Sequence, residues 1–166
     1  MNDAVYEHLV VRKSTPKDKV IRIAIIFILA VALLFGMGSF GTIAFAVVLL
    51  LGFLAHTFIF TKLNVEYEYT VLNHDIDVDA IYSRAKRKRQ LSFDFQKAEI
   101  IAPASSPRVA SRKPEKTYDF SSGEKNQKTY AIYMNIDQKN VCILIDGDPG
   151  LLNHIRPWMG SKMYND

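Results

Sequence analysis

The chain changes its hydrophobic pattern once, shortly after residue 60. Residues 20–60 form an almost unbroken apolar run, in which Arg22 and His56 are the only ionisable side chains. Beyond this run, apolar and polar positions alternate along much of the chain. A long apolar run is typical of membrane-spanning helices, and alternation with a period of two is typical of half-buried strands.

The apolar run is long enough for two spans joined by a tight turn. Residues 36–41 include three glycines, which permit the backbone angles that such a turn requires. We therefore predict a hairpin over residues 16–62, with spans at 17–35 and 40–60. Each span is close to the roughly 20 residues that cross a hydrocarbon core.

The residues before the first span carry a helix start signal. Thr15 offers a hydroxyl at the N-cap, Pro16 has no N–H to leave unsatisfied, and Asp18 places an acid near the positive helix end. A signal sequence cleaved near residues 44–46 is the rival interpretation. We disfavour it because that cut would fall inside the apolar run.

Lysine and arginine lie beside both outer ends of the predicted hairpin and are absent from its turn. The flanking cations are Arg12, Lys13, Lys17, Lys19, Arg22 and Lys62. The positive-inside rule then predicts a multi-pass protein of the plasma membrane with both termini in the cytoplasm. Cys142, the single cysteine, agrees with that compartment because it can form no intrachain disulfide, and its apolar neighbours predict a buried thiol.

The N-terminal segment, residues 1–15, is predicted to be cytoplasmic. Val5, Tyr6, Leu9 and Val10 fall on a rough helical stripe. This pattern indicates either a short helix lying on the inner leaflet or a frayed end whose basic residues only set the topology.

Residues 63–166 are predicted to form a cytoplasmic, mainly β domain. Apolar residues alternate with polar ones in several short segments that are rich in aromatic and β-branched side chains. The seven expected strands are 65–71, 75–82, 91–95, 98–102, 117–120, 129–136 and 140–146. Residues 103–116 hold three prolines and three serines and are predicted to be a long surface loop.

A short helix is expected after the last strand. Asp148 is placed to cap it and Pro149 to begin it, whereas Pro157 should stop or kink it near Arg156. The helix would cover the sheet with its apolar residues, which are Leu151, Leu152, Ile155, Trp158 and Met159.

The predicted fold class is membrane α with a soluble, mainly β part. It comprises a two-helix transmembrane hairpin followed by a seven-stranded antiparallel barrel or sandwich with a C-terminal helix. This order of elements resembles the pleckstrin homology (PH) superfold. Pro157 leaves a shorter terminal helix than that fold usually has, so the closure of the barrel stays open.

The motifs carry a second resemblance, which covers nearly the whole chain. The segment VEYEYTVLNHDIDVDAIYSRAKRKRQLSFDF, followed by EIIAP, SPRV and DFSSG, resembles an uncharacterised family of small two-span membrane proteins of Gram-positive bacteria with a PH-like cytoplasmic domain. The resemblance implies architecture and supplies no catalytic residues.

The sequence offers little catalytic chemistry. It contains none of the motifs GxGxxG, GxxxxGK[ST], HExxH, CxxC or GxSxG. His8, His56, His74 and His154 show no metal-ligand spacing. We therefore expect no enzymatic activity, no cofactor and no metal site.

Two acidic groups have competing interpretations. Asp75, Asp77 and Asp79 would share one strand face, where they could recruit a divalent cation or pair with basic residues across the hairpin. We favour the pairing. Asp146 and Asp148 resemble a metal-binding DxD motif, but the following proline favours a helix cap.

His56 is the one intramembrane polar candidate, since ionisable residues inside a span are often functional. It could serve a proton relay or a ligand. It also lies six residues before Lys62, about 9 Å along a helix, and could therefore reach the head-group region instead.

Residues 84–89 hold five cations, which we place at the turn between the second and third strands. They are Arg84, Lys86, Arg87, Lys88 and Arg89, and Arg108, Arg112, Lys113 and Lys116 of the long loop could add a second patch. These side chains could contact anionic lipid head groups or an acidic protein partner. Alternatively, they form a solvated turn that protects a sheet edge.

A nucleic-acid partner is not expected. Residues 61–166 contain 16 Lys and Arg against 14 Asp and Glu, a net charge of +2, so the domain has no general basic character. The chain as a whole has a formal net charge of +4.

The favoured function is a membrane-anchored, non-enzymatic interaction module, either alone or as an accessory subunit of a membrane complex. The alternative is a regulatory or structural subunit of a transporter or pore in which the spans carry the function. The spans offer few polar side chains to line a path, namely Ser39, Thr42, His56 and Thr57, which favours the first interpretation.

Overall fold

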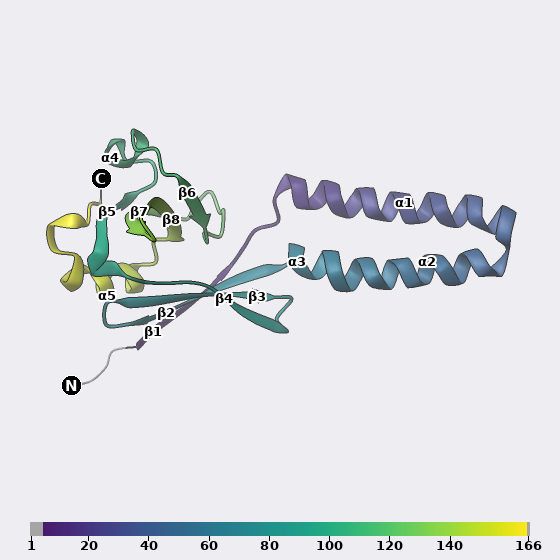
Figure 1. Ribbon diagram of the computed structural model, residues 1–166, viewed down its shortest axis with the longest axis horizontal. Coiled ribbons are helices and arrows are strands. Elements are labelled where there is room, and N and C mark those ends of the chain that lie inside the picture. Colours follow the sequence, from purple (N-terminus) through teal and green to yellow (C-terminus); the bar gives the residue numbers. More distant parts are fainter. Residues whose placement is uncertain (1–4, 166) are drawn as a thin grey trace. The chain divides into compact units, whose positions relative to one another are not determined.

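A computed structural model of the chain describes residues 5–165. It divides into two compact units. Ser14–Val65 form a helical unit, and residues 5–13 together with 66–165 form a β unit (Figure 1).

The helical unit is a helical hairpin. It consists of α1 (Pro16–Phe40), α2 (Thr42–Ala55), a π-helical segment η1 (His56–Phe60) and α3 (Thr61–Leu63). The predicted start is confirmed. The Thr15 hydroxyl accepts a hydrogen bond from the Asp18 amide at 3.2 Å, and the Asp18 carboxylate accepts one from the Thr15 amide at 2.8 Å.

The turn of the hairpin is shorter than predicted. The helix continues to Phe40, and Gly41, with a φ of 59°, makes the break. Gly36 serves packing instead, because a Cβ there would lie 2.9 Å from the Ala44 Cβ. A residue without a side chain lets α1 and α2 approach closely at this point.

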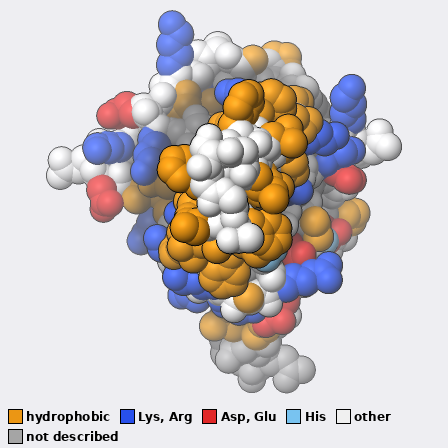
Figure 2. Space-filling view, turned by 90° about the vertical axis from the view of Figure 1, so that its right-hand side faces the viewer, with side chains coloured by type: hydrophobic (Ala, Val, Ile, Leu, Met, Phe, Trp, Pro, Cys, Tyr) orange, Lys and Arg blue, Asp and Glu red, His pale blue; other side chains and the backbone are white. Residues whose placement is uncertain are grey.

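Hydrophobic side chains cover the outside of the hairpin, as the space-filling view from its tip shows (Figure 2). The helices Pro16–Phe40 and Thr42–Leu63 are long and apolar enough to cross a membrane, judged by length and composition. Almost none of their residues is buried within the chain, unlike the core helices of soluble domains.

The first sheet, sheet A, has the strand order β1-β2-β3-β4. Its strands are β1 (Val5–Val11), β2 (Val65–Leu72), β3 (Asp75–Tyr82) and β4 (Lys86–Asp94). The expected N-terminal helix or frayed end is therefore wrong for residues 5–11. They pair antiparallel with β2 and bury Val10, which leaves Leu9 exposed.

The second sheet, sheet B, has the order β5-β7-β8-β6. Its strands are β5 (Ala98–Pro103), β7 (Thr129–Ile136), β8 (Lys139–Asp146) and β6 (Lys116–Asp119), and a 3-10 turn η2 (Phe95–Lys97) leads into it. Strand β6 runs parallel to β8. The chain passes from β6 through residues 120–128 and β7 before it enters β8, so the two strands can point in the same direction.

The expected seven-stranded antiparallel barrel is corrected on three points. Residues 5–165 contain eight strands, in two sheets of four, and these sheets do not close into a barrel. One strand pairing is parallel. The prediction of a mainly β unit that follows two apolar helices and ends in a helix is confirmed.

The expected long surface loop at residues 103–116 is partly ordered by a short helix. Ser106 caps α4 (Pro107–Ala110), and Val109 is buried on the outer side of sheet B. The Tyr133 hydroxyl donates to the carbonyls of Val109 and Arg112, each at 3.4 Å. The segment therefore packs against the sheet.

The terminal helix α5 (Pro149–Met159) is capped as predicted but longer, and a 3-10 turn η3 (Gly160–Lys162) follows it. The Asp148 carboxylate accepts from the amides of Gly150 and Leu151, at 2.8 and 3.2 Å. Pro157 does not stop the helix. The carbonyl that its missing N–H would have bonded belongs to the exposed Asn153, so water can satisfy it.

Both sheets share one apolar core. Its fully buried side chains include Val71 and Ile76 of sheet A, Ile132 and Ile143 of sheet B, and Ile155 of α5. A smaller apolar cluster on the other side of sheet B contains Cys142, whose thiol is buried as predicted.

Candidate functional site

The basic cluster lies mostly on a strand. The turn between β3 and β4 is limited to residues 83–85, where Ser83 and Arg84 have φ values of 48° and 57°. The prediction of a turn is therefore confirmed for Arg84 and wrong for Lys86 to Arg89, which begin β4. This strand is an edge of sheet A.

The three arginines of the cluster pair with acids on one face of sheet A. Arg84 contacts Glu66 at 3.0 Å, and Arg87 contacts Glu68 at 2.6 Å. Arg89 contacts Asp77 at 2.8 Å and Asp79 at 3.1 Å. We call these residues the ion-pair ladder, and they are Glu66, Glu68, Asp77, Asp79, Arg84, Arg87 and Arg89.

The ladder agrees with the predicted pairing for two of the three β3 acids. Asp77 and Asp79 meet the basic residues across the hairpin. Asp79 is buried, and its hydrogen bond raises the pKa of the Arg89 guanidinium. The arginine charges on this face are therefore largely compensated by neighbouring carboxylates.

Lys86 and Lys88 differ from the arginines. Successive residues of a strand point to opposite faces, so these two lysines lie on the face of β4 opposite the ladder. Both are exposed, and within residues 5–165 neither side chain forms an ion pair or hydrogen bond. They are the uncompensated charges of the cluster.

The cluster lies at the end of sheet A where the chain connects to the helices. Val11, the last residue of β1, pairs with Glu66 near the start of β2. Residues 12–15 link β1 to α1, and Asn64 alone links α3 to β2. Arg84 also reaches Glu66, so the β3–β4 turn lies at this same end of the sheet.

The second basic patch is separate from the cluster. Arg108, Arg112 and Lys113 lie on or just after α4, which packs on sheet B away from the β3–β4 turn (Figure 1). The Arg108 guanidinium stacks over the Tyr164 ring at 4.2 Å. Arg112 contacts Glu99 at 2.9 Å and so is compensated. Arg108 and Arg112 help to hold the α4 segment and the C-terminal tail on sheet B, and Lys113 is exposed.

His56 lies on the outside of the helical hairpin. Its side chain is exposed at the start of the π-helical segment, and its ring meets the Phe60 ring edge-on at 6.4 Å. Its carbonyl accepts from the Thr61 hydroxyl at 3.1 Å. Within residues 5–165 no acidic or basic side chain pairs with it, so a relay role stays a prediction.

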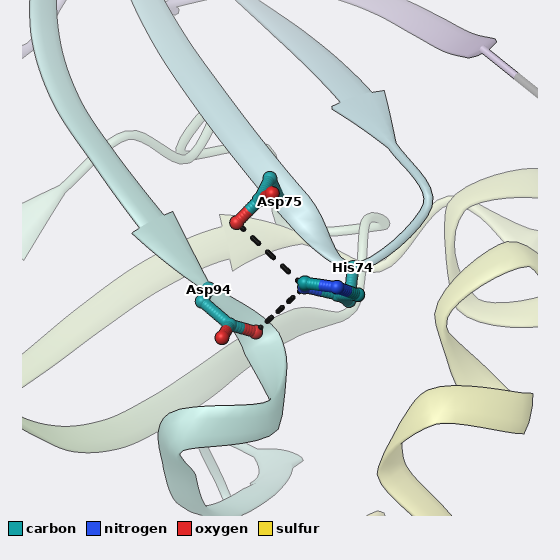
Figure 3. A group of neighbouring side chains, drawn as sticks. All are labelled: His74, Asp75 and Asp94. Carbon is teal, nitrogen blue, oxygen red and sulfur yellow. Dashed lines mark hydrogen bonds and ion pairs between the residues drawn. The ribbon is translucent and has the colours of Figure 1, made fainter. Parts of the chain in front are cut away.

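The structure brings together a group of potential metal ligands that the sequence did not predict. His74 follows β2, Asp75 begins β3 and Asp94 ends β4, and their side chains converge (Figure 3). His74 and Asp94 are 20 positions apart in the sequence. Only the pairing of β3 with β4 brings them together, and histidine spacing alone could not reveal it.

Tyr6 and Asp148 connect β1 to the start of α5. The Tyr6 hydroxyl donates a short hydrogen bond to the Asp148 carboxylate. Burial, followed by this bond, raises the pKa of Tyr6 to about 12. Burial alone would raise the pKa of Asp148, but the hydrogen bonds from Tyr6 and from two helix amides outweigh it and lower that pKa. The arrangement anchors β1 and offers no obvious reaction centre.

Comparison with known proteins identifies a family. A family model described as "Bacterial PH-like domain (DUF6106)" matches residues 2–165. The chain belongs to this family. No curated protein and no solved structure matches it.

Membership in the Bacterial PH-like domain family confirms the predicted PH-like resemblance over the whole chain. PH-like domains are generally non-catalytic and suggest an interaction module. On the β3–β4 hairpin of this member, Lys86 and Lys88 are exposed.

Proposed function

We propose that this member of the Bacterial PH-like domain family is a membrane-anchored, non-enzymatic module whose β3–β4 hairpin contacts anionic lipid head groups. In this proposal, α1 and the α2–α3 helix span the plasma membrane. Residues 5–13 and 66–165 lie on its cytoplasmic side.

The observation that carries the proposal is the position of the uncompensated lysines. Both chain links to the helices leave sheet A at the end that bears the β3–β4 turn. One of those links is a single residue, Asn64, so this end of the sheet cannot extend far from the helix end that it follows. If the helices span a bilayer, Lys86 and Lys88 are within reach of its surface.

The energetics favour lysines that have no ion-pair partner among residues 5–165. A Lys or Arg near an anionic leaflet contributes about 1 kcal/mol. The ladder arginines could interact with lipid only by breaking their ion pairs with carboxylates, whereas Lys86 and Lys88 have no such pairs to break. Lys13, Lys17 and Lys62, which are exposed close to the helix ends, can add to the same contact.

An acidic protein partner could be bound by the same lysines, but the membrane is the anionic surface that chain connectivity brings near them. The alternative of a transporter or pore subunit draws no support from the helices. Their exposed surface is apolar, and His56 lies on the outside.

Hydrogen exchange of the full chain in lipid nanodiscs tests the proposal. Amides of residues 80–92 should exchange more slowly in discs containing phosphatidylglycerol than in phosphatidylcholine discs, because lipid contact shields the hairpin. The difference should disappear at 1 M salt, where charges are screened within about 3 Å.

Matched variants separate lysine contact from general charge. The double variant Lys86→Ser, Lys88→Ser should abolish the lipid-dependent difference, and Lys125→Ser, Lys139→Ser, which removes two exposed lysines outside the hairpin, should preserve it. Equal exchange in both kinds of disc would contradict the proposal. Protection found only in native membranes, with their proteins present, would favour an acidic partner.

A further inference from the structure

His74, Asp75 and Asp94 converge from three places in sheet A (Figure 3). His74 Nδ1 lies 3.0 Å from Asp94 Oδ1 and 3.7 Å from Asp75 Oδ1. One ligand atom from each of the three residues lies within 4.8 Å of the other two. Imidazole nitrogen and carboxylate oxygens are a ligand set that suits divalent transition metals.

The spacing fits an ion with little side-chain movement. Zinc binds histidine nitrogen and carboxylate oxygen at about 2.0–2.2 Å, so two ligands of a tetrahedral site lie roughly 3.3 Å apart. The two nitrogen–oxygen separations in the structure, 3.0 and 3.7 Å, bracket this value.

The charges also favour a cation at this place. Asp75 and Asp94 are direct partners across the β3–β4 pair. Like charges placed directly opposite each other destabilise a sheet. The two arginines of β4 pair with other acids: Arg87 pairs with Glu68, and Arg89 pairs with Asp77 and Asp79. Among the described residues, the polar partners of Asp75 and Asp94 are the imidazole and one backbone amide.

The backbone holds two of the ligands in place. The His74 carbonyl accepts from the Phe95 amide at 2.8 Å, and Asp94 Oδ1 accepts from the Gln96 amide at 2.8 Å. Asp75 is two-thirds exposed, which leaves a path from solvent. Three protein ligands leave at least one coordination position for water or for a group from a partner.

We propose that His74, Asp75 and Asp94 form a binding site for a divalent transition-metal ion of the zinc type. The ion takes the place of the proton on His74 Nδ1, and the neutral ring then carries its proton on Nε2. The ion ties the β2–β3 turn to the end of β4. This site does not depend on the membrane contact proposed above.

The chain contains a natural reporter for this site. Trp158, its single tryptophan, lies on α5 with its ring 5.4 Å from the His74 ring in an edge-on arrangement. A paramagnetic ion bound by His74 would quench the fluorescence of this indole. No label is needed.

Titration of the full chain in detergent with Ni²⁺, with the purification tag removed, tests the proposal. We expect saturable quenching of Trp158, which Zn²⁺ reverses by competition. Asp75→Asn exchanges a carboxylate ligand for a neutral amide, and His74→Ala removes the imidazole. Each should raise the half-saturating concentration by about ten-fold or more, because even changes beside the ligands of a metal cost about 10–100-fold in affinity. Asp75→Asn is the safer variant, because the exposed Asp75 caps no element.

Two controls locate the ion. His154→Ala removes the histidine of α5, which lies one turn before Trp158, and should leave the titration unchanged. Asp137→Asn removes an exposed acid from the β7–β8 turn and should also have no effect. Quenching that never saturates, or that persists at the same concentration in both His74→Ala and Asp75→Asn, would overturn the proposal.

Discussion

At the residue scale, tight positions fix the corner between sheet B and α5. Gly147 follows β8 directly and precedes the helix cap Asp148. A Cβ at Gly147 would lie 2.4 Å from the Tyr130 ring and 3.0 Å from the Lys128 carbonyl. Tyr130 is buried in the core, so its ring cannot move away freely.

Gly147→Ala should therefore lower the free energy of unfolding by about 1–3 kcal/mol, the cost of overpacking. Thermal unfolding followed by near-ultraviolet circular dichroism would measure it. Gly38→Ala is the control, because a Cβ there meets no atom within 4 Å and alanine favours the helix. Equal stability of both variants would show that the corner is not tightly packed.

The contribution of the Tyr6–Asp148 hydrogen bond to stability should be lost at both low and high pH. Asp148 has a lowered pKa in the folded chain, so its contribution is complete above its ordinary value of 3.8 and is lost as pH falls through the folded value. Tyr6 has a raised pKa, so its contribution is complete below pH 10 and is lost as pH rises toward about 12.

Tyr6→Phe should reduce stability at neutral pH by about 1 kcal/mol, since one hydrogen bond to a partly exposed carboxylate is removed. The difference between the natural chain and the variant should shrink below pH 3.8 and above pH 10. Unfolding midpoints across this range would measure it. A difference that stays constant with pH would contradict the role of this bond.

At the element scale, the sequence predicted those elements whose signals are local. The Thr15 cap, the Asp148 cap and the β7–β8 hairpin need only neighbouring residues, and the structure contains them. Strand β1 was not predicted because it forms only by pairing with β2, and the paired residues, from Val11 with Glu66 to Val5 with Leu72, lie 55 to 67 positions apart in the sequence.

Non-local pairing also explains the errors in the candidate site. The segment Lys86 to Arg89 is polar on both faces, so it carries no alternation that marks a strand. Its pairing with β3 makes it one, with a register shift between Val78 and Asp79. The same register brings Asp94 to His74, which no local pattern could indicate.

Strand β1 can be tested by two neighbouring apolar residues. Val10→Ser should lower the free energy of unfolding by about 2 kcal/mol, because Val10 is buried in the core. Leu9→Ser should change it by less than about 0.5 kcal/mol, because Leu9 is about half exposed. Similar losses in chemical denaturation of both variants would contradict the strand and its register.

Replacing the arginines of β4 should affect the unfolding midpoint differently from replacing its lysines. Arg87→Ser, Arg89→Ser leaves the buried Asp79 without its guanidinium partners and should lower the unfolding midpoint by several degrees. Lys86→Ser, Lys88→Ser should leave the midpoint unchanged, since no carboxylate in the described part of the chain pairs with these lysines. Equal midpoints for the two double variants would remove the distinction on which the lipid proposal rests.

At the scale of the whole molecule, the chain combines an apolar helical hairpin with a PH-like unit of two four-stranded sheets. The hairpin interrupts sheet A between its first two strands, so both connections leave from one end of that sheet. This connectivity gives the β3–β4 hairpin its proposed place beside the membrane surface.

The most direct measurement of that claim is fluorescence quenching by lipid. A polarity-sensitive dye on Ala85→Cys reports from the exposed β3–β4 turn, and the natural Cys142 is buried and protected from labelling. In nanodiscs that contain lipid with a nitroxide on its head group, we expect strong quenching with anionic lipid and weaker quenching with neutral lipid. Lys86→Ser, Lys88→Ser should reduce the anionic value to the neutral one. Quenching that is absent from both kinds of disc would contradict the account.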